Sequence, residues 1–200
     1  VRAGQFKGFK PFAMLGADVW GKTIGIVGFG RIGQAVGRRA LGFGMKVLYY
    51  DAIRLAPEKE ASFQASYSEI DPLIAEWAFV SLHVPLSDET RHLIDARRLS
   101  MMKPTAFLVN ISRGPVVDEQ ALVEALQAKR IAGAALDVFE REPEVAPGLL
   151  ELPNVVLTPH IGSGSWETRT NMAHVAVRNI LAALDGQTPP NLVNSAVPRS

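Results

Sequence analysis

The chain has 200 residues, of which 48% are hydrophobic and 20% are charged, as in an ordinary folded protein. This composition excludes a disordered chain, a collagen-like repeat and a coiled coil. With 21 basic and 20 acidic residues the net charge is +1, so we expect no nucleic-acid partner, which would call for a basic excess. The absence of cysteine excludes disulfides, thiolate catalysis and zinc–thiolate sites, and it fits a reducing, cytoplasmic location. No apolar run approaches the roughly 18 residues of a membrane-spanning helix, and the first residues are no signal peptide, so we expect no membrane partner.

Short apolar runs alternate with amphipathic stretches after a Gly- and Lys-rich segment at 1–20, which we interpret as a linker. Strands are predicted at 24–27, 46–50, 78–83, 106–110, 132–136 and 155–157. Helices are predicted at 34–43, 67–76, 95–102, 118–128 and 165–185, with Asp118 as a cap and no element assigned to the polar stretch 52–66. Alternating strands and helices of this kind predict an α/β fold with a doubly wound parallel sheet. Ligands bind such sheets at the carboxyl ends of the strands.

A glycine motif, Gly28-Phe29-Gly30-Arg31-Ile32-Gly33, directly follows the first predicted strand and opens the first helix. In this context the motif indicates dinucleotide binding. The first glycine permits a tight turn, the second lets the backbone approach a pyrophosphate, and the third lets the helix pack on the strand. The alternative is a glycine-rich turn that binds nothing.

The end of the second predicted strand points to the kind of dinucleotide. Asp51 ends this strand, where a carboxylate would accept hydrogen bonds from the adenosine ribose hydroxyls. A 2′-phosphate would meet a like charge there, which favours NAD. Arg54 follows closely and keeps NADP as an alternative.

Three later strands also end in residues that can carry chemistry. Arg113 follows the fourth strand, the acids of Asp137–Glu142 follow the fifth, and His160 follows the sixth. Taken singly, they fit a surface arginine, a solvated acidic loop and a structural histidine equally well. Together they place a cation, an acid and an imidazole at one edge of one sheet, which is what an active site requires.

Several segments carry a family resemblance, namely Gly28–Gly33, Asp51, Ser81–Leu86, Asn110–Gly114, Asp137–Pro143 and Pro159–Gly164. Together they resemble the D-isomer-specific 2-hydroxyacid dehydrogenases, and Pro147–Ser163 is most similar to the glyoxylate/hydroxypyruvate reductases. The resemblance implies a Rossmann NAD-binding domain at 21–162. It also implies remnants of a second, flavodoxin-like substrate domain at 1–20 and 163–200, so we expect the chain to be a fragment. Family members are usually homodimers.

The resemblance also implies a reaction, the NAD(P)H-dependent reduction of glyoxylate or hydroxypyruvate to the D-2-hydroxy acid. His160 would act as the general acid, because imidazole exchanges protons near neutral pH. Glu142, rather than the neighbouring Glu140, would orient His160. Arg113 would hold the substrate carboxylate or polarise its carbonyl.

Cofactor-binding roles follow from the same resemblance, and no metal site is implied. Asp137 would contact the nicotinamide end of the cofactor. His83 lies at the end of a cofactor-lining strand, whereas His92 and His174 are assigned no functional role. The cofactor-binding residues are predicted to be Gly28, Phe29, Gly30, Arg31, Ile32, Gly33, Asp51, Arg54, Val84, Pro85, Thr90, Ile111, Ser112, Arg113, Asp137, His160 and Gly162.

Two other functions stay open at this point. One is a phosphoglycerate dehydrogenase-type enzyme, although many of these carry a further regulatory domain. The other is a non-catalytic NAD-sensing module on the same fold, which keeps the cofactor loop and can keep the catalytic residues. Formate dehydrogenase is disfavoured because that enzyme carries glutamine where Glu142 stands.

Overall fold

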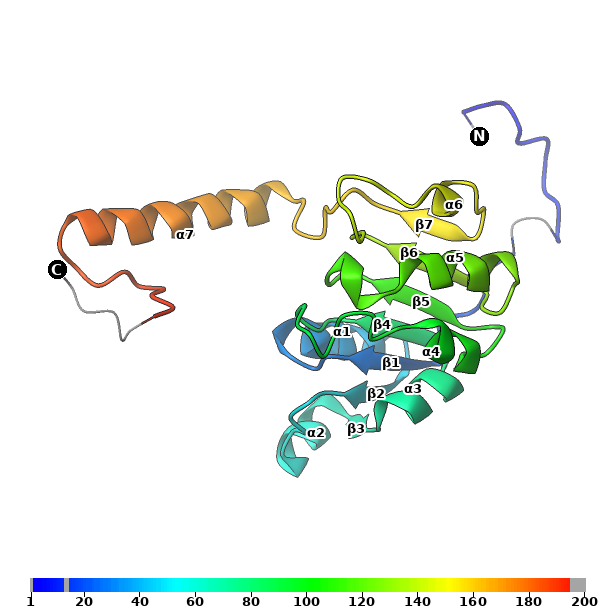
Figure 1. The fold of residues 1–200 in the computed structure, drawn as a ribbon, viewed down its shortest axis with the longest axis horizontal. Helices are drawn as coiled ribbons and strands as arrows, with labels where there is room; N and C mark the ends of the chain where they lie inside the picture. The colour runs from blue at the N-terminus through cyan, green and yellow to red at the C-terminus, as the bar shows by residue number, and fades with distance from the viewer. Residues whose placement is uncertain (1, 13–14, 195–200) are drawn as a thin grey trace. The chain divides into compact units, whose positions relative to one another are not determined.

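The computed structural model describes residues 2–12 and 15–194 of the chain (Figure 1). It divides into two compact units, Val1–Thr158 and Pro159–Ser200, and each is described by itself. The first unit contains a seven-stranded parallel sheet with the strand order β3-β2-β1-β4-β5-β6-β7, which confirms the predicted α/β class. The strands are β1 (Thr23–Val27), β2 (Lys46–Tyr50), β3 (Ala65–Tyr67), β4 (Phe79–Leu82), β5 (Phe107–Asn110), β6 (Gly133–Leu136) and β7 (Val155–Leu157).

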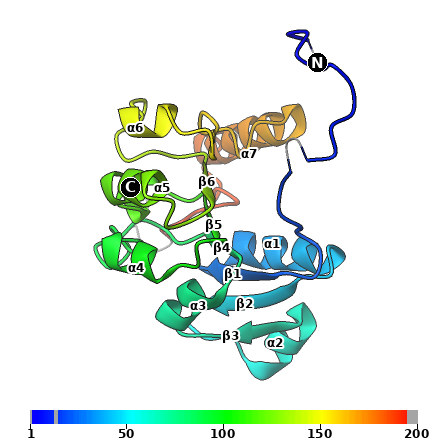
Figure 2. The same ribbon diagram turned by 90° about the vertical axis from the view of Figure 1, so that its right-hand side faces the viewer.

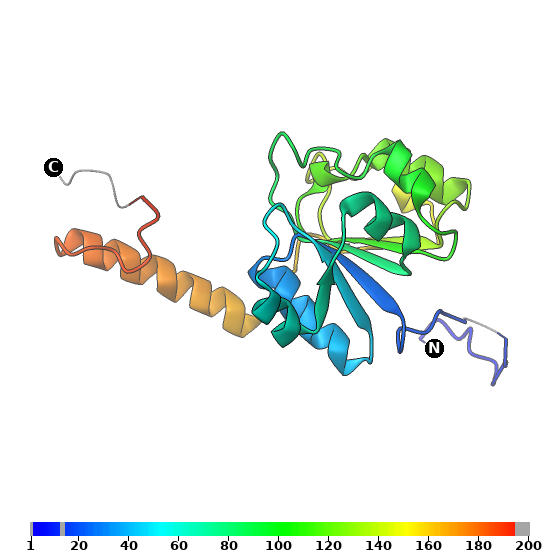
Figure 3. The same cartoon turned by 90° about the horizontal axis from the view of Figure 1, so that it is seen from below.

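Helices cover both faces of this sheet (Figures 2 and 3). On one face, α1 (Arg31–Gly42) contacts α2 (Pro57–Phe63) over a core that contains Phe29, Val47 and Tyr49. On the other face, α3 (Ile70–Glu76), α4 (Ala96–Met101) and α5 (Glu119–Gln127) pack in sequence over a larger core. The short elements η1 (Gly114–Val116) and α6 (Pro147–Leu150) follow β5 and β6.

The register of the sheet brings the carboxyl ends of six strands into one row. Val27 pairs with Tyr50 and Leu82, and Leu82 pairs in turn with Asn110. The row continues through Leu136 to Leu157. The chain order reverses between β1 and β4, and this switch point is where doubly wound sheets bind their ligands. The functional candidates are the residues that immediately follow this row.

The stretch 52–66 is the main difference from the sequence prediction, which assigned it no element. It contains α2 and the start of β3, a strand of three residues at the edge of the sheet. The predicted helix at 67–76 was wrong at its start, because Tyr67 ends β3 and α3 begins at Ile70. Helix α1 also begins three residues earlier than predicted, at Arg31 inside the glycine motif. Strand β3 could not be predicted, because three residues are too few for an alternation of apolar and polar side chains to be recognised.

The second unit contains α7 (Trp166–Leu184), within one residue of the predicted helix. The hydroxyl of Ser165 caps it by accepting a hydrogen bond from the backbone N–H of Thr168 at 3.1 Å. No residue of α7 is buried, and this includes its apolar residues Met172, Val175, Ala176, Ile180 and Leu184. Among the described residues, no helix is both long and apolar enough to cross a membrane.

Candidate functional site

The glycine motif forms the turn between β1 and α1, and two of its glycines are required sterically. Gly28 has φ +92°, and a Cβ atom there would lie 2.7 Å from the backbone carbon of His83. A Cβ atom on Gly33 would lie 2.1 Å from the carbonyl oxygen of Gly28, so the helix can approach the strand only with glycine there. Both constraints agree with the roles predicted from the motif.

Gly30 differs from these two glycines because a Cβ atom there would meet nothing within 4 Å. The space is therefore open at the N-cap of α1, where no side chain caps the helix and no acidic residue occupies the first turn. Uncapped N–H groups and the positive end of the helix dipole attract phosphate. This open, uncapped cradle fits the pyrophosphate of a dinucleotide.

Asp51 is held against the glycine motif from the end of β2. One carboxylate oxygen accepts a hydrogen bond from the backbone N–H of Phe29 at 2.6 Å, and the other accepts one from Ile53 at 3.1 Å. The side chain of Phe29 is buried and stacks on Tyr49, so only its backbone is available at this turn. The carboxylate is therefore fixed next to the phosphate cradle.

A pocket of about 440 Å³ lies along the carboxyl edge at the switch point between β1 and β4. Thr90 stabilises the part of the lining that follows β4. Its hydroxyl donates a hydrogen bond to the carbonyl of Pro85 and accepts one from the N–H of Ser87, both at 2.7 Å. The pocket is lined by Gly28, Gly30, Tyr50, Asp51, Ala52, His83, Val84, Pro85, Ser87, Glu89, Thr90 and Leu93.

A second pocket of about 440 Å³ shares His83, Val84 and Pro85 with the first. Its remaining wall is formed by Ile32, Leu86, Ile111, Ser112 and Arg113. The two pockets therefore follow one another along the sheet edge, with the glycine motif and Asp51 at one end and Arg113 at the other. A dinucleotide is an elongated ligand that spans such a cleft.

The Arg113 loop is held by a buried amide side chain. Asn110 is 1% exposed, and its side-chain oxygen accepts hydrogen bonds from the N–H and the hydroxyl of Ser112, at 3.0 and 2.9 Å. Its amide nitrogen donates to the carbonyl oxygen of Arg113 at 2.9 Å. The Arg113 side chain is exposed, and its guanidinium donates to the carbonyl of Ser112 at 2.7 Å.

The loop after β6 packs directly on this turn, since a Cβ atom on Gly114 would lie 1.9 Å from the carbonyl of Phe139. Asp137 is 7% exposed and accepts a hydrogen bond from the hydroxyl of Thr158 at 2.5 Å, which links the ends of β6 and β7. The carboxylate of Glu142 is exposed and accepts a hydrogen bond from the backbone N–H of Phe139 at 3.0 Å. The structure therefore brings Arg113 and the loop that carries Glu142 to the same part of the edge.

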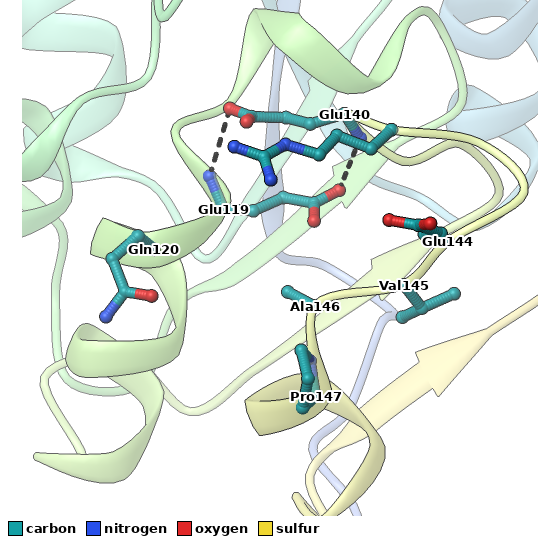
Figure 4. Close-up of a pocket in the computed structure, with 8 residues that line it drawn as sticks. Glu119, Gln120, Glu140, Glu144, Val145, Ala146 and Pro147 are labelled. Carbon is teal, nitrogen blue, oxygen red and sulfur yellow. Dashed lines mark hydrogen bonds between the residues drawn. The ribbon is translucent and has the colours of Figure 1, made fainter.

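A buried carboxylate anchors the Glu142 loop to α5 (Figure 4). Glu119 is 7% exposed and accepts a hydrogen bond from the N–H of Glu140 at 2.6 Å, and the backbone of Ala146 also hydrogen-bonds to it. Burial raises the pKa of the Glu119 carboxyl. The Glu140 carboxylate in turn accepts from the backbone of Glu119 at 3.4 Å and pairs with His92 at 2.6 Å. His92, which the sequence left without a role, thus fixes the Glu140 side chain.

His83 lies where the two pockets meet, and its Nε2 atom is 2.9 Å from the Ser81 hydroxyl. In the described part of the chain its Nδ1 atom is buried without a hydrogen-bond partner. Burial lowers the pKa of His83 to about 4, so the imidazole is neutral at physiological pH. A neutral side chain here leaves the charges of the two pocket linings to Asp51, Glu89 and Arg113.

The predicted residues His160 and Gly162 belong to the second unit, which begins at Pro159. His160 has φ +52°, in the left-handed region, which is sparsely populated by residues other than glycine. The grouping of His160 with Arg113 and Glu142 remains a prediction. Among the described residues, no cluster of histidine and acidic side chains could hold a metal ion.

Three side chains that organise the edge had no role in the sequence prediction, namely Asn110, Glu119 and Thr158. Asn110 was part of a quoted motif, and its place at the end of a buried strand was the available signal, because a buried amide must find partners. Glu119 follows the predicted cap Asp118 and looks like an ordinary acid in the first turn of a helix. Its partners, Glu140 and Ala146, lie 21 and more residues away, so no local pattern marks it.

Comparison with known proteins agrees with this geometry. Residues 1–162 match the family described as D-isomer specific 2-hydroxyacid dehydrogenase, NAD binding domain. The chain is 52% identical over 201 residues to a glyoxylate reductase of Thermococcus gammatolerans, covering 98% of this chain and 60% of that protein. It thus spans about 60% of the length of the curated relatives it matches.

Solved structures give the same result. A glyoxylate reductase from Paecilomyes thermophila has a TM-score of 0.84 and 41% identity, covering 94% of this chain and 56% of that one. D-lactate dehydrogenase with NAD+ from Lactobacillus jensenii has a TM-score of 0.82 and 32% identity, covering 93% of this chain and 59% of that one. The chain therefore belongs to the D-isomer-specific 2-hydroxyacid dehydrogenase family and contains its NAD-binding domain.

Proposed function

We propose that this chain is the cofactor-binding part of a reductase that converts glyoxylate or hydroxypyruvate to the D-2-hydroxy acid with NADH. The observation that carries the proposal is the continuous cleft, in which two pockets share His83, Val84 and Pro85. Its glycine end suits the adenosine and pyrophosphate, and its Arg113 end suits a nicotinamide beside an anionic substrate. The 52% identity to a glyoxylate reductase supports this choice of substrate.

The reaction transfers two electrons and two hydrogens to a carbonyl group. When bound, NADH supplies a hydride to the carbonyl carbon. The imidazolium of His160 then donates its proton to the carbonyl oxygen, so a C–H and an O–H bond form while the C=O π bond breaks. The products are the 2-hydroxy acid, NAD+ and a neutral His160, which recovers its proton from solvent.

Arg113 and Glu142 support this transfer through charge. The planar guanidinium of Arg113 binds the substrate carboxylate or stabilises the negative charge that develops on the carbonyl oxygen. The Glu142 carboxylate, which accepts a hydrogen bond from the N–H of Phe139, is assigned the role of orienting His160 and favouring its charged form. Asp137, which is buried at the end of β6, would contact the nicotinamide end of the bound cofactor.

The remaining parts of the proposal concern the rest of the enzyme. Residues 1–20 and 163–200 are assigned to a substrate domain, and 21–162 to the cofactor domain. This division rests on the family resemblance. The enzyme is assigned a homodimeric state on the family resemblance, and the substrate domain supplies the remaining contacts to the 2-oxo acid.

Two measurements test the proposal. Isothermal titration of the chain with NADH is expected to give one site per chain, and Gly30→Ala is expected to weaken it. The protein in its natural length is expected to oxidise NADH with glyoxylate or hydroxypyruvate, and His160→Ala to abolish that rate. Cofactor binding without turnover on any small 2-oxo acid would contradict the reductase and support an NAD-sensing module.

A further inference from the structure

Arg54 is the cation nearest in sequence to Asp51, and the structure pairs its side chain with an acid of α2. Its guanidinium makes two hydrogen bonds to the Glu60 carboxylate, from Nε to Oε1 at 2.9 Å and from Nη2 to Oε2 at 3.2 Å. It also lies 5.1 Å from the centre of the Tyr67 ring. A guanidinium with both a bidentate partner and an aromatic face is fixed in position.

The Glu60 carboxylate is held in place by a hydrogen bond from a side chain of the hydrophobic core. The hydroxyl of the buried Tyr49 donates to Oε1 of Glu60 at 2.7 Å and accepts from the backbone N–H of Leu55 at 2.9 Å. The Glu60 side chain is only 14% exposed, whereas that of Arg54 is 62% exposed. Hydrogen bonds from Arg54 and Tyr49 lower the pKa of the Glu60 carboxyl, so the pair is fully charged at neutral pH. The carboxylate is therefore a fixed acceptor that holds the more exposed arginine.

Arg54 follows closely after residues that line the first pocket, where the adenosine of the cofactor is proposed to bind. The Arg54–Glu60 pair can therefore affect the choice of cofactor. Asp51 and Ala52 line the pocket, and the N–H of Ile53 closes a tight turn onto Asp51 immediately before Arg54. An arginine at this point of the chain is suited to a 2′-phosphate, which distinguishes NADPH from NADH. The fixed Asp51 carboxylate repels that phosphate, and the Glu60 pair removes the cation that would offset the repulsion.

We propose that Glu60 is a specificity-determining residue, which withholds Arg54 from the cofactor 2′-phosphate and so makes the chain discriminate against NADPH. The inference rests on the cofactor site of the proposed function. It places the control of cofactor choice on α2, outside the glycine motif and outside the pocket lining.

The test compares the dissociation constants of NADH and NADPH for the chain, measured by isothermal titration. Glu60→Gln removes the charge but keeps an oxygen that accepts from Tyr49, so the fold is retained. We expect this variant to bind NADPH about tenfold more tightly than the native chain does, as one charge-assisted contact allows, and to leave the affinity for NADH within about twofold. Glu58→Gln is the matched control, because it removes the same charge from the same exposed helix and is expected to change neither constant.

Variants at Arg54 separate capture of the arginine from simple repulsion by Glu60. Arg54→Gln alone is expected to leave the ratio of the two constants unchanged, since the native arginine is already withheld. In the double variant with Glu60→Gln, the gain in NADPH binding is expected to disappear. A gain that persists in the double variant would overturn the inference, because the charge of Glu60 itself would then be the cause.

The outcomes also separate this inference from the proposed function. If the native chain binds NADH but Glu60→Gln keeps the native ratio, the inference is wrong and the proposed function stands. If Arg54→Gln alone weakens NADPH binding, Arg54 is not withheld, and the inference is again overturned. If the native chain binds neither cofactor, the proposed function fails and the inference fails with it.

Discussion

The two ends of the cofactor cleft are built in different ways. The glycine end consists of backbone, with two glycines that admit no Cβ atom, one that leaves an open cradle, and an uncapped helix. The Arg113 end is held by side chains from distant elements, among them Asn110, Glu119 and Thr158. Local sequence specifies the first end, whereas only the fold assembles the second. Substitutions at the glycine end should therefore act by steric overlap with the backbone, and those at the Arg113 end by loss of side-chain hydrogen bonds.

Gly33→Ala should have the largest effect, at the backbone end. Its Cβ atom would lie 2.1 Å from the carbonyl oxygen of Gly28, so α1 must move away from β1. We expect a loss of about 3 kcal/mol in the free energy of unfolding, the upper range of overpacking, and loss of NADH binding. Urea unfolding and isothermal titration measure the two effects.

Gly42→Ala is the control for that change, because it lies in the same helix with no atom within 4 Å of the added Cβ. It should leave NADH binding unchanged and stabilise the chain slightly through helix propensity. Gly30→Ala should keep native stability and lose affinity only. Equal stability of Gly33→Ala and Gly42→Ala would contradict the close approach of helix and strand.

His83, where the two ends meet, should make the chain sensitive to acid. Its pKa in the folded chain is about 4, below the ordinary 6.5, so protonation favours the unfolded state. The free energy of unfolding is unaffected by His83 above pH 6.5, where the imidazole is neutral in both states. It falls by about 3 kcal/mol as the pH falls to 4, because the unfolded chain then binds the proton more readily. Urea unfolding at pH 7 and pH 4 measures the loss.

His83→Gln should flatten the pH dependence in that window, because glutamine does not titrate. The ion pair of Asp71 with Arg97 and Arg98 acts at lower pH, since it lowers the pKa of Asp71 to about 2. Its contribution is present above pH 3.8 and is lost only as the pH falls towards 2. An unchanged slope between pH 6.5 and 4 in His83→Gln would contradict the burial of a neutral imidazole.

The same comparison explains how much could be predicted from the sequence. The doubly wound sheet and the roles of Gly28 and Gly33 follow from local spacing, because strand period, helix period and glycine geometry are local properties. Strand β3 and helix α2 were missed because they are short and largely polar. Strand β3 is fixed by pairing with β2, and α2 contacts β3 and α1. The anchors Glu119 and Thr158 were missed because each bonds to a residue 21 positions away.

Asn110→Ala should damage the side-chain end of the cleft. It removes two hydrogen bonds to Ser112 and one to the carbonyl of Arg113, all at a site that is 1% exposed. We expect a loss of about 2 kcal/mol in the free energy of unfolding, since buried polar groups lose their partners, together with weaker NADH binding.

The control for Asn110 is Asn154, which lies at the amino ends of strands β6 and β7, away from the cofactor cleft. Asn154→Ala removes a single partly buried hydrogen bond, from the Asn154 amide to the carbonyl of Ala132 at 3.0 Å. It should cost about 1 kcal/mol and leave NADH binding unchanged. If the two variants weaken NADH binding equally, Asn110 supports the sheet in general rather than the Arg113 loop.

Glu119→Gln should have the smallest effect, because it keeps an oxygen for the N–H groups of Glu140 and Ala146 and removes a buried charge. We expect a change within about 1 kcal/mol at pH 7, whereas Glu119→Ala should lose about 2 kcal/mol by leaving those groups unpaired. Hydrogen exchange should show faster exchange of the Glu140 amide in Glu119→Ala than in Glu119→Gln.

Because the pKa of Glu119 is raised in the folded chain, the native chain should gain stability relative to Glu119→Gln as the pH falls from 7 towards 4.5. Unfolding curves of the two proteins at both pH values measure this gain. If the difference in their free energies of unfolding is the same at both pH values, the pKa of Glu119 is not raised by burial, and its hydrogen bonds fully compensate the buried charge.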